Sequence, residues 1–163
     1  MIYTGNYKNC SKSSMFVSIS GDSGKEADFK GSCYKDLAPK LSFWNEWHDN
    51  IGKISEFENM KFYIENYYHQ VLKYLDISNL IQTFGSSFII GCYEGENEFC
   101  HRYIVASYLE LMLGFEIPEV KIEDGKLIKI KSNKIKNLID KILCDVIIND
   151  INKEEDIKLV KRL

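Results

Sequence analysis

A short apolar segment between two long amphipathic helices constrains the fold of this chain more than any other feature. Residues 58–75 repeat apolar side chains at spacings of three and four, which predicts a helix with one buried stripe. Residues 87–93 form a compact apolar run, and residues 99–113 predict a second helix that ends at Gly114. Because a short apolar run after a helix is typical of a buried parallel strand, the order of elements favours a layered α/β domain.

Two further segments near the N-terminus predict strands of the same sheet. Residues 2–4 and 15–20 are short and apolar, and the second run ends in a glycine-rich turn. We therefore expect a small, mainly parallel sheet with helical crossovers. Residues 21–42 show no regular pattern, and a loop of this length inside a domain is often functional. Residues 43–48 are aromatic and can either stack on a base or sugar or seal an edge of the core.

The C-terminal region predicts an addition to this domain. Asp124-Gly125 between alternating apolar residues indicates a hairpin over residues 120–130. An amphipathic helix is expected over residues 135–147, followed by a last short helix in the charged tail, residues 152–163. We divide the chain into an α/β domain, residues 1–122, and a hairpin and helical extension of the same domain, residues 123–163. The extension offers helices through which a homodimer can form.

Composition limits the classes of function. The net charge of −3 argues against a general nucleic-acid coat, although the lysine-rich residues 126–136 leave weak nucleic-acid binding open. No apolar run is long enough to span a membrane, and the N-terminus does not resemble a signal peptide. The five cysteines have irregular spacings, which suggests neither disulfides nor a zinc ribbon. We expect a cytoplasmic protein with reduced thiols, no cofactor and no membrane partner.

The loop between the apolar run and the second helix carries most of the reactive side chains. Cys100 is expected in the first helical turn, where free amide groups and the helix dipole favour a thiolate. His101 can donate or accept a proton, and Arg102 can bind a phosphate or carboxylate through two parallel hydrogen bonds. Glu94 lies six residues before Cys100, and Cys92 ends the apolar run. These residues predict an anion site at the edge of the sheet where ligands usually bind.

Other interpretations of the same loop stay open. Glu94, Glu96 and Glu98 oppose a lowered thiol pKa, and consecutive helical residues point about 100° apart. Arg102 can pair with Glu94 or Glu98 to fix the loop, while Cys100 packs as a small apolar side chain. A metal ion held by Cys92, Cys100 and His101 is a further possibility, although no metal is expected.

The run Ile89-Ile90-Gly91-Cys92-Tyr93-Glu94, followed by Phe99-Cys100-His101-Arg102, resembles domain-of-unknown-function family 488 (DUF488). The resemblance extends over residues 1–122 and implies a three-layer, Rossmann-like α/β domain in a cytoplasmic protein. It brings no known reaction, and it marks Cys92, Glu94, Cys100, His101 and Arg102 as the positions shared with the family motif. Many members carry Asp-Val-Arg after the second strand, whereas residues 17–20 of this chain lack both the acid and the arginine.

Two hypotheses of function follow from the loop. The first is an enzyme that acts on a small phosphorylated or nucleotide-like ligand, as a cysteine-dependent hydrolase or transferase. Cys100 would be the nucleophile, His101 or Glu94 the proton carrier, Arg102 the anion-binding group and Cys92 a supporting residue. The second is a non-catalytic module that binds an anion, a nucleic acid or another protein through the same pocket, the aromatic segment or the basic region.

Overall fold

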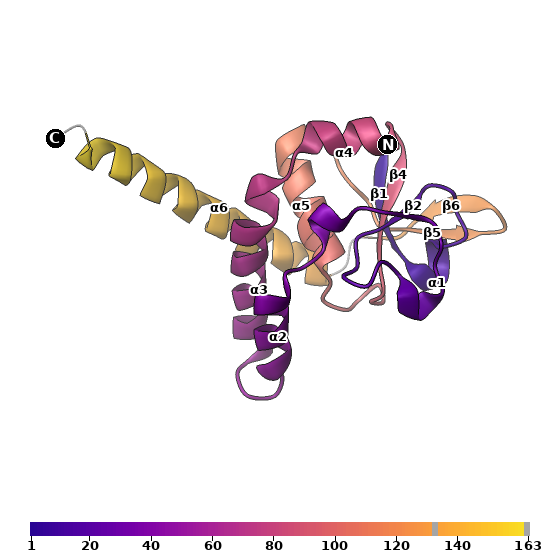
Figure 1. Ribbon diagram of the computed structural model, residues 1–163, viewed down its shortest axis with the longest axis horizontal. Coiled ribbons are helices and arrows are strands. Elements are labelled where there is room, and N and C mark those ends of the chain that lie inside the picture. The colour runs from indigo at the N-terminus through magenta and orange to yellow at the C-terminus, as the bar shows by residue number, and fades with distance from the viewer. Residues whose placement is uncertain (132–133, 162–163) are drawn as a thin grey trace.

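The fold is organised around one parallel sheet (Figure 1). The computed structural model describes residues 1–131 and 134–161. Four strands, all parallel, are arranged in the order β1-β4-β2-β3. Their bounds are Ile2–Asn6 for β1, Phe16–Ser18 for β2, Ser32–Cys33 for β3 and Phe88–Cys92 for β4. The predicted apolar run is the central strand β4, buried along its whole length, and the prediction of a small parallel sheet is confirmed.

The alternation of side chains along β4 divides the interior into two cores. Phe88, Ile90 and Cys92 point to the larger core, which the helices cover. Ile89 points to a smaller core beneath the first helix and the C-terminal hairpin. Gly91 faces this smaller core as well, and a Cβ atom there would lie 1.9 Å from the Phe16 ring. The sheet is therefore covered on both faces, which gives the three layers expected of the fold.

Two of the helices on the larger core come from the two periodic segments. Helix α3 (Glu56–Gln70) begins at Ser55, whose side chain forms a capping box with Glu58. Helix α5 (His101–Leu113) ends at Gly114, which adopts a left-handed φ of 75°. The other helical segments that precede the hairpin are short. They are α1 (Tyr7–Cys10), η1 (Lys25–Ala27), η2 (Lys35–Leu37), α2 (Leu41–Asp49), η3 (Leu72–Tyr74) and α4 (Ile77–Phe84).

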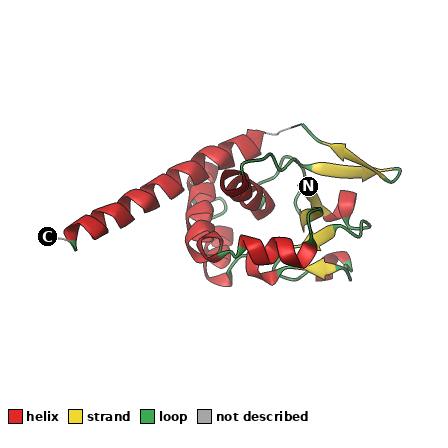
Figure 2. Cartoon of the chain, turned by 90° about the horizontal axis from the view of Figure 1, so that it is seen from above, coloured by secondary structure: helices red, strands yellow, loops and turns green. Residues whose placement is uncertain are grey.

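The C-terminal region differs from the prediction in one respect. The hairpin forms as expected from β5 (Val120–Glu123) and β6 (Lys126–Lys129). The two predicted helices are a single helix, α6 (Lys134–Val160), because no glycine or proline interrupts this segment. Its N-terminal part packs on α5 and α3, and its last turns extend away from the domain (Figure 2). The end of the predicted tail helix, residues 162–163, lies outside the described residues.

Both parts of the extension, the hairpin and α6, contact the α/β domain. Hairpin strand β5 contacts β1 and α1, and a bridge joins Thr4 to Glu119. Lys73 forms ion pairs with Asp150 and Glu154 of α6. In the described residues no helix combines the length and the apolar character needed to cross a membrane.

The topology determines where a ligand can bind. The carboxyl ends of β2 and β4 lie side by side, since Ser18 is paired with Gly91. Residues 93–100 connect β4 to α5, and the predicted irregular segment, residues 21–42, follows β2 and extends into the first residues of α2. That segment contains η1, β3 and η2 between its turns. The edge is therefore enclosed by the reactive loop on one side and by an aromatic helix on the other.

Candidate functional site

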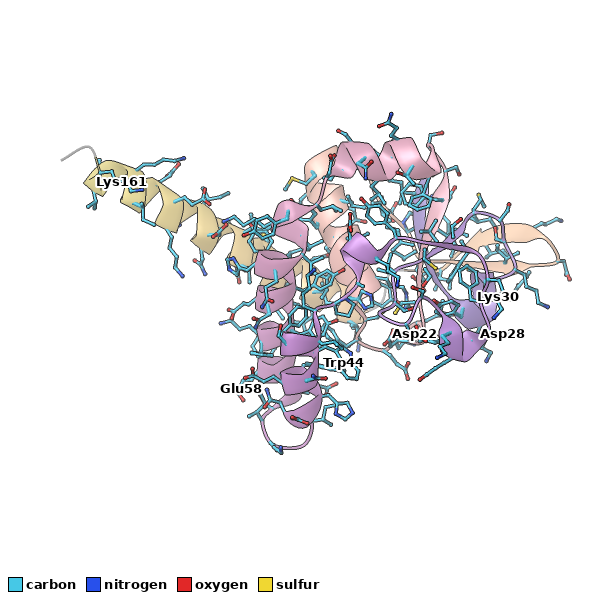
Figure 3. The ribbon with its side chains drawn as sticks, in the orientation of Figure 1. Asp22, Asp28, Lys30, Trp44, Glu58 and Lys161 are labelled. Atoms are coloured by element: carbon cyan, nitrogen blue, oxygen red, sulfur yellow. The ribbon has the colours of Figure 1, made fainter. Side chains whose placement is uncertain are left out.

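A cavity of about 460 Å³ opens at the carboxyl edge of the sheet. Its wall includes Trp44 and Trp47 of α2, so the predicted aromatic segment contributes to the cavity as well as to the core. Trp44 and Asp22 approach it from α2 and from the loop after β2 (Figure 3). The lining also contains Ser20, Gly21, Glu26, Pro39, Leu41, Tyr63, Cys92, Tyr93, Glu94, Phe99, Cys100 and His101. Four of the five predicted site residues therefore meet at one cavity.

The Cys100 thiol lies against a carboxylate. Its Sγ donates a hydrogen bond to Oε2 of Glu94 at 2.9 Å. Cys100 was expected in the first turn of the helix, but it is the residue that precedes the helix, with extended backbone and no capping bond from its side chain. Cys100 is extended whereas His101 is helical, so their side chains are not spread apart as in two consecutive helical residues. Both side chains therefore reach the same cavity.

His101 is held in a defined orientation. Its Nε2 is 3.0 Å from the carbonyl oxygen of Ile19, and because a carbonyl only accepts hydrogen bonds, Nε2 carries the proton. The other ring nitrogen, Nδ1, lies 3.8 Å from Sγ of Cys92. Ile19 follows β2 and Cys92 ends β4, so the histidine bridges the two strand ends.

The electrostatic environment opposes a free thiolate. Burial raises the pKa of Cys100 well above its usual value, and Cys92 and Glu94 raise it further, although Arg102 lowers it. Burial also raises the pKa of Glu94, but the hydrogen bond from Cys100 and the charge of His101 outweigh this effect and lower it. The helix start was expected to favour a thiolate, whereas the structure favours a thiol beside an ionised Glu94.

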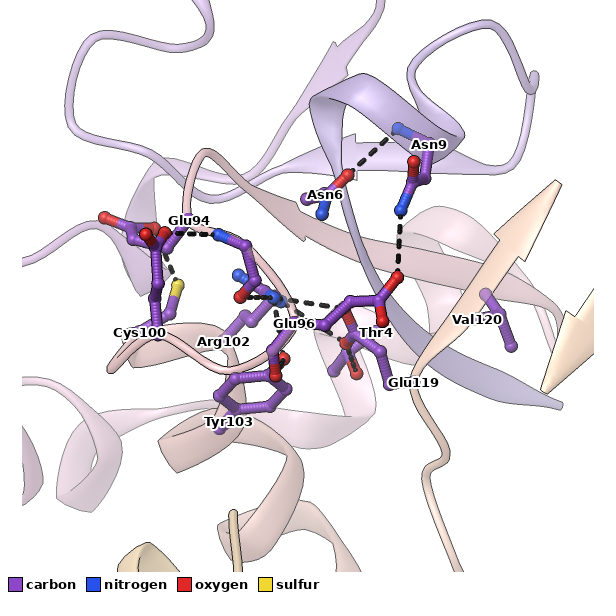
Figure 4. A network of polar contacts seen from close by, with 12 residues as sticks. Thr4, Asn6, Asn9, Glu94, Glu96, Cys100, Arg102, Tyr103, Glu119 and Val120 are labelled. Carbon is purple, nitrogen blue, oxygen red and sulfur yellow. Dashed lines mark hydrogen bonds and ion pairs between the residues drawn. The ribbon is translucent and has the colours of Figure 1, made fainter. Parts of the chain in front are cut away.

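Arg102 points away from the cavity. Its side chain is fully buried, with Nη2 3.0 Å from Oε1 of Glu119 and Nε 3.3 Å from Oε2 (Figure 4). Nη2 also donates to the carbonyl of Gly95 at 3.0 Å and to the Tyr103 hydroxyl at 2.8 Å. Thr4 donates to Glu119 at 2.5 Å. We call these five residues the Arg102–Glu119 network.

The sequence suggested that Arg102 either binds an anion or pairs with Glu94 or Glu98, and the structure places it in neither position. Its ion pair is with Glu119 of the segment before β5, and neither Glu94 nor Glu98 is its partner. Because Arg102 is absent from the cavity lining, the structure gives no support to its expected role as the anion-binding group. The network instead fixes the loop at Gly95 and the start of α5, which positions Glu94 and Cys100.

The loop after β2 supplies residues that sequence reasoning missed. Asp22 accepts hydrogen bonds from the Ser20 hydroxyl and the backbone of Gly24 and Glu26, and Tyr93 donates to it at 2.6 Å. Burial raises the pKa of Asp22, but these hydrogen bonds lower it far more. The signal available in the sequence was the Gly21-Asp22-Ser23-Gly24 turn, which was interpreted only as the end of a strand.

Three buried donors are arranged so that they can hold a metal ion. One donor atom each from Cys92, Cys100 and His101 lies within 4.8 Å of the others. All five cysteines of the chain are free in the structure. We call Cys92, Glu94, Cys100 and His101 the reactive cluster.

Comparison with known families assigns the chain to one of them. The model of the active DUF488-N3 subclade matches residues 15–113, which run from the start of β2 to the end of α5. The chain belongs to the DUF488 family. The match includes the whole reactive cluster of this DUF488 protein, together with Arg102. Comparisons with curated proteins and with solved structures gave no significant match.

Proposed function

We propose that this DUF488 protein is a cysteine-dependent hydrolase or transferase that acts on a small, nucleotide-like ligand in its cavity. The observation that carries the proposal is the 2.9 Å contact between the Cys100 thiol and the Glu94 carboxylate at the lining of that cavity. A thiol must lose its proton before its sulfur can bond to an electrophile, and Glu94 is in place to take it.

The simplest reaction forms a bond between the Cys100 sulfur and an electrophilic carbon or phosphorus atom of the substrate. The thiol proton moves to Glu94, and Glu94 returns it to the leaving group as the old bond breaks. Water in a hydrolase, or an acceptor hydroxyl in a transferase, then cleaves the bond to sulfur and restores the thiol. His101 lies at the same lining, where its ring can stabilise the developing charge.

The lining favours the base-like part of a nucleotide over its phosphates. Trp44, Trp47 and Tyr93 offer aromatic faces, while Asp22 and Glu94 contribute negative charge. No lysine or arginine of the described residues lines the cavity. The subclade whose model the chain matches is described as active, which favours catalysis over a purely binding role. Five free thiols fit a reducing compartment, so we place the protein in the cytoplasm.

The test combines ligand binding with turnover. The protein has only two tryptophans, and both line the cavity, so their fluorescence reports directly on its occupancy. We expect a nucleoside or nucleotide from a panel to change this fluorescence and to be converted by the wild type. Cys100→Ala should still bind the compound but lose conversion, and Cys33→Ala, which changes a cysteine outside the cavity lining, should retain both. Unchanged conversion by Cys100→Ala would refute the proposal.

A further inference from the structure

We propose that Cys92, Cys100 and His101 form a binding site for a divalent transition metal ion of the zinc type. This inference rests on the proposed function, because it also takes the reactive cluster as the place where the reaction occurs. It changes the first partner of the Cys100 sulfur, which becomes a metal ion instead of a substrate atom. Cysteine dependence is then retained, because the sulfur is a ligand that the reaction requires.

The distances fit a tetrahedral site. Zinc–sulfur bonds of about 2.3 Å and zinc–nitrogen bonds of about 2.0–2.1 Å place a sulfur and a nitrogen about 3.6 Å apart and two sulfurs about 3.8 Å apart. The Cys92 Sγ to His101 Nδ1 distance is 3.8 Å, and the three donors lie within 4.8 Å of one another. Shifts of about 1 Å or less therefore bring all three donors to bonding distance.

The histidine is already oriented as a ligand. The Ile19 carbonyl holds a proton on Nε2, so Nδ1, which lies 3.8 Å from Sγ of Cys92, is the ring nitrogen that can bind the metal once it is deprotonated. Metal-binding histidines commonly donate their second N–H to a backbone carbonyl in this way. The three donors also come from two rigid positions, the end of β4 and the start of α5, and each of the three residues is buried.

The chemistry of the donors selects the class of metal. Two sulfurs and one imidazole suit zinc and related transition metals better than magnesium or calcium, which prefer oxygen ligands. Binding releases one proton from each thiol, and Glu94 can carry the proton of Cys100 to solvent. The two thiolates then balance the two charges of the ion.

The site keeps one position open toward the cavity. Three protein ligands with a fourth position for water or substrate characterise catalytic zinc, whereas structural zinc has four protein ligands. All three donors line the cavity, as does Glu94. Glu94 is therefore placed either to complete the coordination or to accept a proton from a metal-bound water, which would then be the attacking group in hydrolysis.

Cobalt titration tests the proposal on the full chain. Reduced protein is stripped with a chelator, desalted and titrated with Co²⁺. We expect one equivalent to produce the thiolate-to-cobalt charge-transfer band and the strong visible bands of a tetrahedral site, and Zn²⁺ to abolish them. Cys92→Ser, Cys100→Ser and His101→Ala should lose these bands, while Cys33→Ser and Cys144→Ser should keep them. Absent bands, or bands that survive in both Cys92→Ser and Cys100→Ser, would overturn the site.

A second measurement uses only the wild type, so it remains decisive even if the variants fail to fold. Zn²⁺ should raise the Tm of the stripped wild type, and an unchanged Tm at saturating Zn²⁺ would count against the site. The two proposals fail separately. Metal binding without turnover of any compound in the panel would refute the proposed function alone. Turnover by stripped protein in the presence of chelator, together with absent cobalt bands, would refute the metal site alone.

Discussion

His101 and Arg102 are neighbours in the chain, yet they belong to regions of opposite character. Arg102 lies in a network in which charges and hydrogen bonds are nearly all satisfied within the protein, and only its Nη1 is buried without a hydrogen-bond partner. His101 lies in the reactive cluster, where two thiols and a carboxylate border a cavity. Burial is similar in the two regions, since Arg102 and Cys100 are 0% and 2% exposed.

This difference shows why burial alone does not identify a functional residue. A buried ion pair whose partners are all protein groups stabilises one arrangement of the chain. Buried groups that keep unused bonding capacity toward a cavity can instead bind a ligand or react. The Cys-His-Arg motif contains both kinds of residue, since Arg102 pairs with Glu119 while Cys100 and His101 line the cavity.

Loss of Arg102 should produce the largest change in stability. Arg102→Ala leaves Glu119 buried without its cation, and removal of one partner of a buried pair typically costs about 3–5 kcal/mol. Cys100→Ala, the matched variant from the reactive cluster, should cost only about 1 kcal/mol, because it removes a single sulfur beside a cavity. Urea denaturation of both variants measures the contrast. Equal losses would show that the two regions do not differ in this way.

The alkylation rates of the cysteines should depend on access through the cavity as well as on the exposed fraction of each side chain. Cys10 and Cys100 are both buried, at 1% and 2% exposure, but only Cys100 lines the cavity. Burial raises the pKa of both thiols, that of Cys10 to about 11, so access through the cavity is what should separate them. With a small alkylating reagent and mass spectrometry, we expect partly exposed Cys33 to react first, Cys100 next and Cys10 last. If Cys10 reacts before Cys100, the cavity does not give access to the cluster.

The smallest change in stability should come from Asp22→Asn, because the Asp22 carboxylate accepts several hydrogen bonds but is exposed to solvent. Its folded pKa is lowered, so its contribution to stability is complete above the unfolded carboxyl pKa of about 3.9 and is lost as the pH falls toward the folded value. The difference in unfolding free energy between wild type and Asp22→Asn should be constant from about pH 8 to 5 and shrink below about pH 4. Urea denaturation across this range measures it, with the exposed Asp49→Asn as control. A difference that persists unchanged at acidic pH would contradict the role of these hydrogen bonds.

The sequence predicted the elements of the fold better than the partners of its polar side chains. The central strand, α3, α5 and the hairpin follow from apolar periodicity and turn residues, which are local signals. The partner of Arg102 was missed because Glu119 is 17 residues away and belongs to the segment before the hairpin. The contact between Ile19 and His101 joins positions 82 apart, so no local pattern indicates it. The continuity of α6 was missed because the amphipathic pattern was followed only to residue 147 and the charged tail from residue 152 was treated as a separate helix, although no residue between them breaks a helix.

The close approach of Phe16 to Gly91 has a consequence for how such chains vary. The aromatic ring occupies the space in which residue 91 would place its first side-chain carbon, on the face of β4 opposite to Cys92. Any larger residue at position 91 would push β4 away from β2 and move the end of the strand that carries Cys92 and Glu94. We therefore expect positions 16 and 91 to exchange volume among related sequences, so that a side chain at position 91 is accompanied by a smaller residue at position 16.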